Sequence, residues 1–267
     1  MLKLEEAAKK VKKHFTFGEI TKVNKYIETA KLINQQVKPY SKILDLGCGN
    51  AVIPALLSEL GHEVTGVDDL QDPVHTVEYR KKLEKFVNNF NINYVVESIF
   101  GFESEKEYDA VLMNEIVEHL TCVRDALNIG INALKTDGVF MIGLPSSVAL
   151  IKRVNCLLGK TIYPEVGYVY YNVGPYRSHI REYTPIEVKH LLKYSGLVDI
   201  KIVTKNLFTR EVYEQGKGIS KILYKTYALL ATYPNFRDTI LAWGKKPKNW
   251  SMQTDPVALK KFKENYL

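Results

Sequence analysis

The sequence predicts an α/β fold organised around one strand–turn–helix segment, and three observations support it. The apolar run Ile43–Leu46 carries a single acid and stops at Gly47-Cys48-Gly49, which is typical of a buried strand that ends in a tight turn. Apolar residues then recur at helical spacing over residues 51–60. A second short apolar run, residues 63–67, leads to Asp68. Two strands joined by a helix form a βαβ unit, in which the strands are parallel.

The glycine turn has the character of a ligand site. Gly47 and Gly49 let the backbone turn sharply and approach a ligand without interference from Cβ, and the helix that follows presents unpaired N–H groups. Asp68 comes about 20 residues later, where a carboxylate receives the two hydroxyls of a ribose. A dinucleotide enzyme would have a third glycine at the position of Val52. The alternative is an α/β crossover with a tight turn and no ligand.

Periodicity along the rest of the chain continues the alternation of helices and strands. Residues 1–37 carry apolar side chains at helical intervals, so we expect two helices broken near Phe17-Gly18. Thr184-Pro185 is a typical helix start. The other expected elements are helices at residues 77–88, 115–127 and 186–192, and strands at residues 94–97, 108–114, 139–142, 198–203 and 239–244.

Two stretches depart from this pattern and are expected insertions, at about residues 146–182 and 206–238. Regular patterning lapses in the first, which is rich in tyrosine. A loop after the carboxyl end of a strand commonly builds a substrate pocket, although it could also pack on itself. The second carries an amphipathic pattern from Ile219 to Leu230, which favours a helix that covers the core or a dimer face over one that lies on a membrane surface. We expect a domain at 38–248, helices at 1–37 and a tail at 249–267.

Composition limits the classes of protein. With 267 residues, 46% hydrophobic and 25% charged, one globular domain is expected. The net charge of +7 is mild for a surface of this size. The sequence also has no compact stripe of basic and aromatic residues of the kind that binds nucleic acid. Cys48, Cys122 and Cys156 have no paired or metal-type spacing, which fits a reducing cytoplasm. No run approaches the ~20 apolar residues of a membrane span. We therefore expect a soluble cytoplasmic chain, with peripheral membrane contact left open.

The segment Asp45–Gly49 resembles motif I of the class I S-adenosylmethionine (SAM) methyltransferases. Tyr108–Leu112 followed by Glu118-His119-Leu120, and the segment 133–142, are similar to two further motifs of that family, although Thr136-Asp137 replaces a proline and a glycine. The resemblance covers about residues 41–246. It implies a Rossmann-like sheet of seven mostly parallel strands with helices on both faces, and N-terminal helices that lie across the cofactor cleft. The alternative for these helices is a cap on the sheet edge. The cofactor-binding residues that it implies are Asp45, Gly47, Cys48, Gly49, Asp68, Asp69, Glu97, Ser98 and Asn114.

A second group of residues follows the fourth expected strand. Glu115, Glu118 and His119 have the spacing of one helix face, beside the expected position of the transferred methyl, and His179 precedes the helix after the first insertion. A hydroxyl acceptor needs a base or a metal to lose its proton, so Glu115, His119 and His179 are candidate catalytic residues.

The Glu-x-x-Glu-His group resembles that of the ubiquinone-biosynthesis O-methyltransferases, which use magnesium. Together with the later histidine it resembles the metal site of small-RNA 2′-O-methyltransferases. A site for Mg²⁺, Mn²⁺ or Fe²⁺ at Glu115, Glu118, His119 and His179 is therefore implied, and a structural role stays open. The expected function is O-methylation of a small molecule, lipid precursor or sugar. The alternatives are an RNA methyltransferase and a non-catalytic SAM-fold protein, and the sequence leaves the oligomeric state open.

Overall fold

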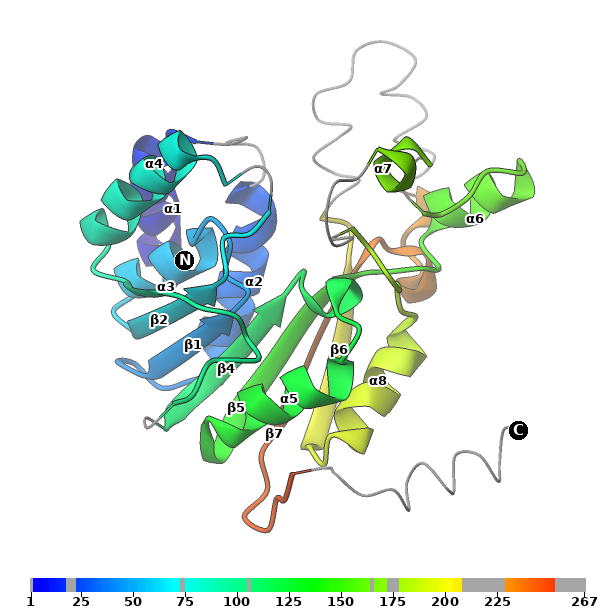
Figure 1. The fold of residues 1–267 in the computed structure, drawn as a ribbon. Coiled ribbons are helices and arrows are strands. Elements are labelled where there is room, and N and C mark those ends of the chain that lie inside the picture. Colours follow the sequence, from blue (N-terminus) through cyan, green and yellow to red (C-terminus); the bar gives the residue numbers. More distant parts are fainter. Residues whose placement is uncertain are drawn as a thin grey trace.

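A single open sheet of seven strands forms the centre of the molecule (Figure 1). The computed structural model describes residues 2–17, 23–72, 75–104, 107–163, 166–171, 178–207 and 229–252. The strand order is β3-β2-β1-β4-β5-β7-β6; β1 to β5 pair in parallel, and β7 is antiparallel to both of its neighbours. This confirms the predicted seven-stranded, mostly parallel sheet. The strands are β1 Lys42–Leu46, β2 Glu63–Asp68, β3 Asn93–Val96, β4 Tyr108–Asn114, β5 Leu134–Pro145, β6 Val198–Lys205 and β7 Thr239–Lys245.

Helices cover both faces of the sheet, so the inner strands are largely apolar. Successive residues of a strand point to opposite faces, and Ile43 and Leu44 of β1 accordingly belong to two separate hydrophobic clusters. Residues of α1 to α4 join Ile43 in the first cluster, and those of α5 and α8 join Leu44 in the second (Figure 1). The helices are α1 Leu2–His14, α2 Val23–Gln36, α3 Val52–Glu59, α4 Val77–Asn89, α5 Val123–Asn132, α6 Leu150–Leu157, α7 Gly167–Tyr170 and α8 Pro185–Tyr194, with short 3₁₀ helices η2 Val117–His119 and η3 Pro234–Phe236.

Helix α8 begins as its sequence predicts. The Thr184 hydroxyl accepts a hydrogen bond from the Glu187 N–H at 3.2 Å, and the Glu187 carboxylate accepts one from the Thr184 N–H at 2.8 Å. Pro185 occupies the first turn, where its missing N–H has no helical partner to lose. This reciprocal cap fixes where the chain enters the helix after the first insertion.

The predicted helix at residues 115–127 is wrong. Glu115 has a φ of 57°, in the left-handed region, and its N–H donates to the Gly143 carbonyl oxygen at 2.7 Å, so it is bonded to β5 instead of a helical turn. One 3₁₀ turn follows, and α5 begins only at Val123. Glu115, Glu118 and His119 therefore do not share one face of a helix.

The first insertion contains more regular structure than expected. Helix α6 carries apolar residues at helical spacing, yet it buries none of its side chains in the core. The predicted amphipathic segment 219–230 and the tail lie largely or wholly outside the described residues. Over the part of the chain that the structure describes, no helix has the length and apolar character needed to cross a membrane.

Both insertions are anchored at one residue, Asp238. Its carbonyl oxygen accepts from the Ser146 N–H at 2.7 Å, just after β5, and its Oδ1 accepts from the Leu207 N–H at 2.9 Å, just after β6. The Asp238 N–H donates in turn to Asn206 Oδ1 at 3.3 Å. Asp238 thereby joins the start of the first insertion to both ends of the second.

Candidate functional site

A cleft of about 780 Å³ lies at the carboxyl ends of the parallel strands. Open α/β sheets bind ligands in this position, and the volume suits a ligand of cofactor size. Eight of the nine expected cofactor residues line it: Asp45, Gly47, Cys48, Gly49, Asp68, Asp69, Ser98 and Asn114. The sequence motifs therefore converge on one cavity.

The turn after β1 requires its glycines for two different reasons. Gly47 has a φ of 75°, and a Cβ there would meet the Ile116 side chain at 2.7 Å, so both backbone and packing exclude a larger residue. Gly49 has a φ of 50°, but nothing lies within 4 Å of its Cβ position, so only its backbone conformation favours glycine. Cys48 lies between them, and the absence of a side chain at Gly66 on β2 leaves room for its sulfur.

Asp45 is a buried carboxyl at the base of the cleft. It is 2% exposed, and its Oδ1 has no hydrogen-bond partner among the described residues. Burial and the neighbouring Asp68 carboxylate raise the pKa of Asp45 to about 8. A buried carboxylate is stabilised mainly by a positive charge beside it, so this site suits a ligand that carries a cation.

Asp68, at the end of β2, is fixed by the turn that it faces. Its Oδ2 accepts from the Gly49 N–H at 2.8 Å, and its Oδ1 accepts from the Leu70 N–H at 2.9 Å. The Tyr94 hydroxyl, from β3, donates to the Gly49 carbonyl oxygen at 2.8 Å. These bonds set the position of the carboxylate before any ligand arrives, as the ribose prediction requires.

The end of β3 decides between the two candidates for the adenine edge. Ser98 lines the cleft, whereas Glu97 does not. The Glu97 Oε1 instead accepts from the Ser98 N–H at 2.9 Å. The prediction that Glu97 lies in the cofactor site is wrong, because its side chain folds back on its own turn.

Helix α2 both packs on the core and faces the cleft. Ala30 and Ile33 are fully buried in the first cluster, while Tyr26 lines the cleft. Helix α2 therefore reaches the cleft while it packs on the core, which favours helices that lie across the cleft over a cap on the sheet edge. The position of Tyr26 was not found from the sequence, because the apolar spacing of the helix marks only the face toward the core.

An ion pair with Lys25 of α2 holds the carboxylate of Glu115 in place. The Lys25 ammonium lies 2.6 Å from Glu115 Oε2, and their side chains are 10% and 22% exposed. Burial favours the neutral amine, but the attraction of Glu115 outweighs it and raises the pKa of Lys25. Glu115 lines the cleft as part of this ion pair. It does not belong to the group formed by the other three candidate residues.

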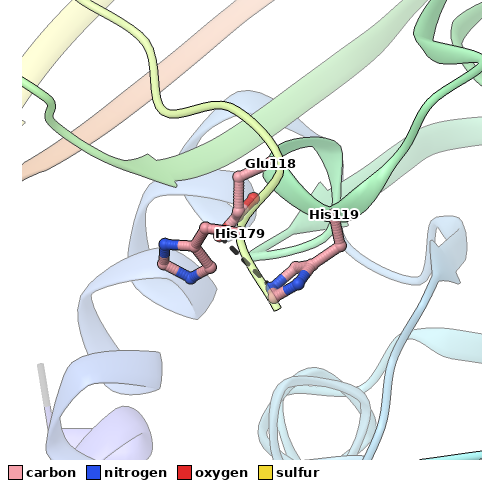
Figure 2. Close-up of side chains that lie close together, drawn as sticks. All are labelled: Glu118, His119 and His179. Atoms are coloured by element: carbon pink, nitrogen blue, oxygen red, sulfur yellow. Dashed lines mark ion pairs between the residues drawn. The ribbon is translucent and has the colours of Figure 1, made fainter. Parts of the chain in front are cut away.

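That group is Glu118, His119 and His179, whose potential ligand atoms lie within 4.8 Å of one another (Figure 2). Glu118 is fully buried, and neither of its carboxyl oxygens has a hydrogen-bond partner within the described ranges. Its Oε1 lies 3.9 Å from His119 Nε2. Burial, and then the charge of Glu115, raise the pKa of Glu118. His119 lines the cleft, and its ring centroid lies 4.8 Å from that of His179.

The first insertion reaches the cleft through one residue of its described part, Ile180. Its N–H donates to the Glu118 carbonyl oxygen at 2.8 Å. Tyr163, Tyr170 and Tyr171 are more than half exposed and do not line the cleft. The side chain of Tyr168, and all of Tyr176, lie outside the described residues. A pocket built from the insertion's tyrosines therefore stays a prediction.

Known proteins are similar to this chain in sequence and in fold. Residues 44–142 match the model of a methyltransferase domain family. The chain is 29% identical over 182 residues to the ubiquinone biosynthesis O-methyltransferase of Rickettsia akari, covering 68% of this chain and 66% of that protein. The enzyme of Rickettsia conorii gives the same identity over 57% of its length. The chain thus spans less than two thirds of these relatives.

Two solved structures share the fold. The 1,6-didemethyltoxoflavin-N1-methyltransferase of Burkholderia thailandensis has a TM-score of 0.53 at 16% identity, covering 84% of this chain and 79% of that one. A SAM-dependent methyltransferase of Archaeoglobus fulgidus has a TM-score of 0.54 at 19% identity, covering 82% and 92%. Residues 44–142 thus carry a methyltransferase domain, and the chain has the fold of the class I SAM-dependent methyltransferases. The family resemblance predicted from the motifs is confirmed.

The residues of this methyltransferase domain fit SAM at two points. The Asp45 carboxyl has an oxygen without a partner and suits a positively charged ligand, and Asp68 is held ready for two hydroxyls. The three donors Glu118, His119 and His179 also fit a divalent ion, since two imidazoles and one carboxylate form a common site for such ions. The metal itself stays a prediction.

Proposed function

We propose that this chain binds SAM in the cleft and transfers its methyl group to an oxygen of a small-molecule acceptor. The observation that carries the proposal is the buried, partnerless oxygen of Asp45 below the glycine turn, which suits the charged methionine half of SAM. Asp68 then binds the ribose, Ser98 lies at the adenine edge, and Asn114 borders the sulfonium. The Burkholderia enzyme has been solved with bound S-adenosylhomocysteine, which supports the same cofactor here.

Oxygen is the proposed acceptor atom because the Rickettsia relatives are named O-methyltransferases. A hydroxyl loses its proton as the methyl arrives, and His119 lines the cleft where a base is needed. His179 lies against it and can share this role. Because SAM is already activated, the rest of the catalysis is the positioning of two reactants. A small molecule, a lipid precursor or a sugar fits this scheme.

A divalent ion at Glu118, His119 and His179 is the second proposal for the same step. Both carboxyl oxygens of Glu118 lack a hydrogen-bond partner in the described chain, which is costly for a buried acid unless a cation or a proton is bound. When bound, such an ion would lower the pKa of the acceptor hydroxyl. Glu115 is no part of this set while it is paired with Lys25.

Calorimetric titration of SAM into the purified full-length chain tests the cofactor, with and without EDTA pretreatment and alongside elemental analysis. Binding that weakens in Asp45→Asn but not in Asp109→Asn supports the proposal, since Asp109 forms its ion pair with Lys135 instead. One divalent ion per chain, lost with EDTA, favours the metal. No SAM binding in any condition would overturn the proposed enzymatic function.

Transfer from radiolabelled SAM to a panel of phenols, catechols and sugars, and separately to RNA oligonucleotides, tests the acceptor. Label in a small molecule that disappears in His119→Ala, with SAM affinity retained, supports the base. Full activity of that variant removes His119 from the mechanism. Label in RNA alone would make this an RNA methyltransferase.

A further inference from the structure

Within the first insertion, a chain of polar contacts leads from helix α6 to His179. Glu182 Oε1 lies 2.9 Å from His179 Nδ1, and Oε2 of the same carboxylate is ion-paired with the Lys152 ammonium. Lys152 belongs to α6, while Glu182 lies just before the cap that begins α8. Each oxygen of the Glu182 carboxylate therefore has a partner, His179 for one and Lys152 for the other, and the two partners come from different parts of the insertion.

Glu182 is built to remain a carboxylate. Its side chain is 5% exposed, and those of Lys152 and His179 are 19% and 28% exposed. The Lys152 ammonium lies against one oxygen of this nearly buried carboxyl, in an ion pair that only the ionised form can make. An ionised carboxylate can only accept hydrogen bonds, so the His179 nitrogen that it faces must carry the proton.

The proton on Nδ1 determines whether the other ring nitrogen of His179, Nε2, can accept a proton or bind a metal ion. A neutral imidazole carries one N–H, so a proton held on Nδ1 leaves Nε2 as the acceptor. The His179 ring lies against that of His119, which lines the cleft (Figure 2). An Nε2 lone pair is what a base needs, and it is equally what a metal ligand needs.

We propose that Glu182 is a positioning residue that holds His179 as the Nδ1–H tautomer, and that Lys152 of α6 fixes Glu182 in this role. The insertion thereby sets the orientation of a histidine that lies against His119, which lines the cleft. The tautomer is a property of the chain alone, whereas its use in catalysis rests on the proposed function.

Long-range ¹H–¹⁵N correlation spectra of the ¹⁵N-histidine-labelled full-length chain read the tautomer directly, at a pH where the imidazole is neutral. We expect the His179 signals of the wild type to show Nδ1–H, and those of Glu182→Ala to shift mainly to Nε2–H, the form that an unconstrained imidazole favours. Lys152→Met should give a partial shift in the same direction. Nε2–H in the wild type, or unchanged spectra in Glu182→Ala, would overturn the proposal.

Glu187→Ala is the matched control. Glu187 also pairs with a basic residue, Arg181, at 2.7 Å, and it caps helix α8, but its hydrogen bonds and ion pairs among the described residues are with Arg181 and Thr184 and not with His179. Its loss should lower stability and leave the tautomer unchanged, so a shift in this variant would also overturn the proposal.

Transfer assays add a second measure once an acceptor is found. We expect Glu182→Ala to lower kcat about ten- to a hundredfold, the range seen when a partner that orients a working histidine is removed, with SAM affinity and KM nearly unchanged. Full kcat in this variant would overturn its positioning role. Absence of transfer in the wild type would overturn the proposed function instead, while the tautomer result would stand.

Discussion

Asp45→Asn should stabilise the protein while weakening its cofactor site. The folded state raises the pKa of Asp45 from 3.8 to about 8, so the folded chain binds this proton more tightly than the unfolded chain does. The associated stability is fully present below pH 3.8 and is lost as the pH rises through 8. At pH 7 the carboxyl is ionised in the unfolded chain and still largely protonated in the folded one. Because pH 7 lies about three units above the unfolded pKa, the free energy of unfolding is lower there than at acid pH by about 4 kcal/mol. Asparagine, which does not titrate, avoids this loss.

Urea unfolding of both proteins without ligand, at about pH 5, 6 and 7, measures the difference. We expect the free energy of unfolding of Asp45→Asn to exceed that of the wild type by about 4 kcal/mol at neutral pH, and by progressively less toward acid. SAM affinity should fall about ten- to a hundredfold, as expected for one charged hydrogen bond.

Asp109→Asn is a control for which the expected change in stability at neutral pH has the opposite sign. Burial alone would raise the pKa of Asp109, but its bonds to Lys135 and to the Lys42 N–H lower it, so its stabilisation is present above its unfolded pKa and is lost toward acid. That substitution should destabilise the protein at neutral pH. If Asp45→Asn were no more stable than the wild type at pH 7, or if its gain did not grow with pH, the argument that Asp45 is an isolated buried acid would be refuted.

Three further sets of substitutions test the cofactor site, an ion pair beside the cleft and a helix cap. Asp68→Ala should reduce SAM affinity by at least about tenfold, since it removes the proposed ribose contact, and calorimetry that shows unchanged affinity contradicts that assignment. Lys25→Met and Glu115→Gln should each destabilise, and the double variant should show a coupling energy of about 0.5 to 3 kcal/mol in urea unfolding; additive effects would mean that the ion pair is not formed. Thr184→Ala should lower the free energy of unfolding by about 1 kcal/mol through loss of the cap, and Thr184→Ser, which keeps the hydroxyl, should recover most of it.

The cofactor half of the cleft could be predicted because its signals are local. The strand, the two glycines and the acid of the next strand lie within one short stretch, and each has a backbone or packing reason that the sequence displays. Gly47 illustrates this, since its φ of 75° and its contact with Ile116 both demand glycine. The single error there, Glu97, depended on which way one side chain turns after a strand.

The region around Glu115 and His119 could not be predicted in the same way, because distant segments of the chain meet there. Periodicity after β4 indicated a helix, but the bond from the Glu115 N–H to Gly143 on another strand prevents it. Lys25 pairs with Glu115 from 90 residues away, and Lys152 reaches Glu182 from 30 residues away. No spacing rule along the chain reports such partners.

The anchoring of both insertions at Asp238 has a consequence for how this chain can change. Asp238 joins the two ends of the second insertion through its bond to Leu207, and the Ser147 N–H donates to the Tyr183 carbonyl oxygen at 2.9 Å across the ends of the first. Each insertion therefore leaves and returns at nearly the same point. Lengthening such a loop adds little closure entropy, about 0.6 kcal/mol for each doubling. The pairing of β7 with β5 and β6 can keep its register while the sequence or length of either insertion changes. The insertions are thus free to vary, while Asp45 and Asp68 lie on β1 and β2, outside both of them.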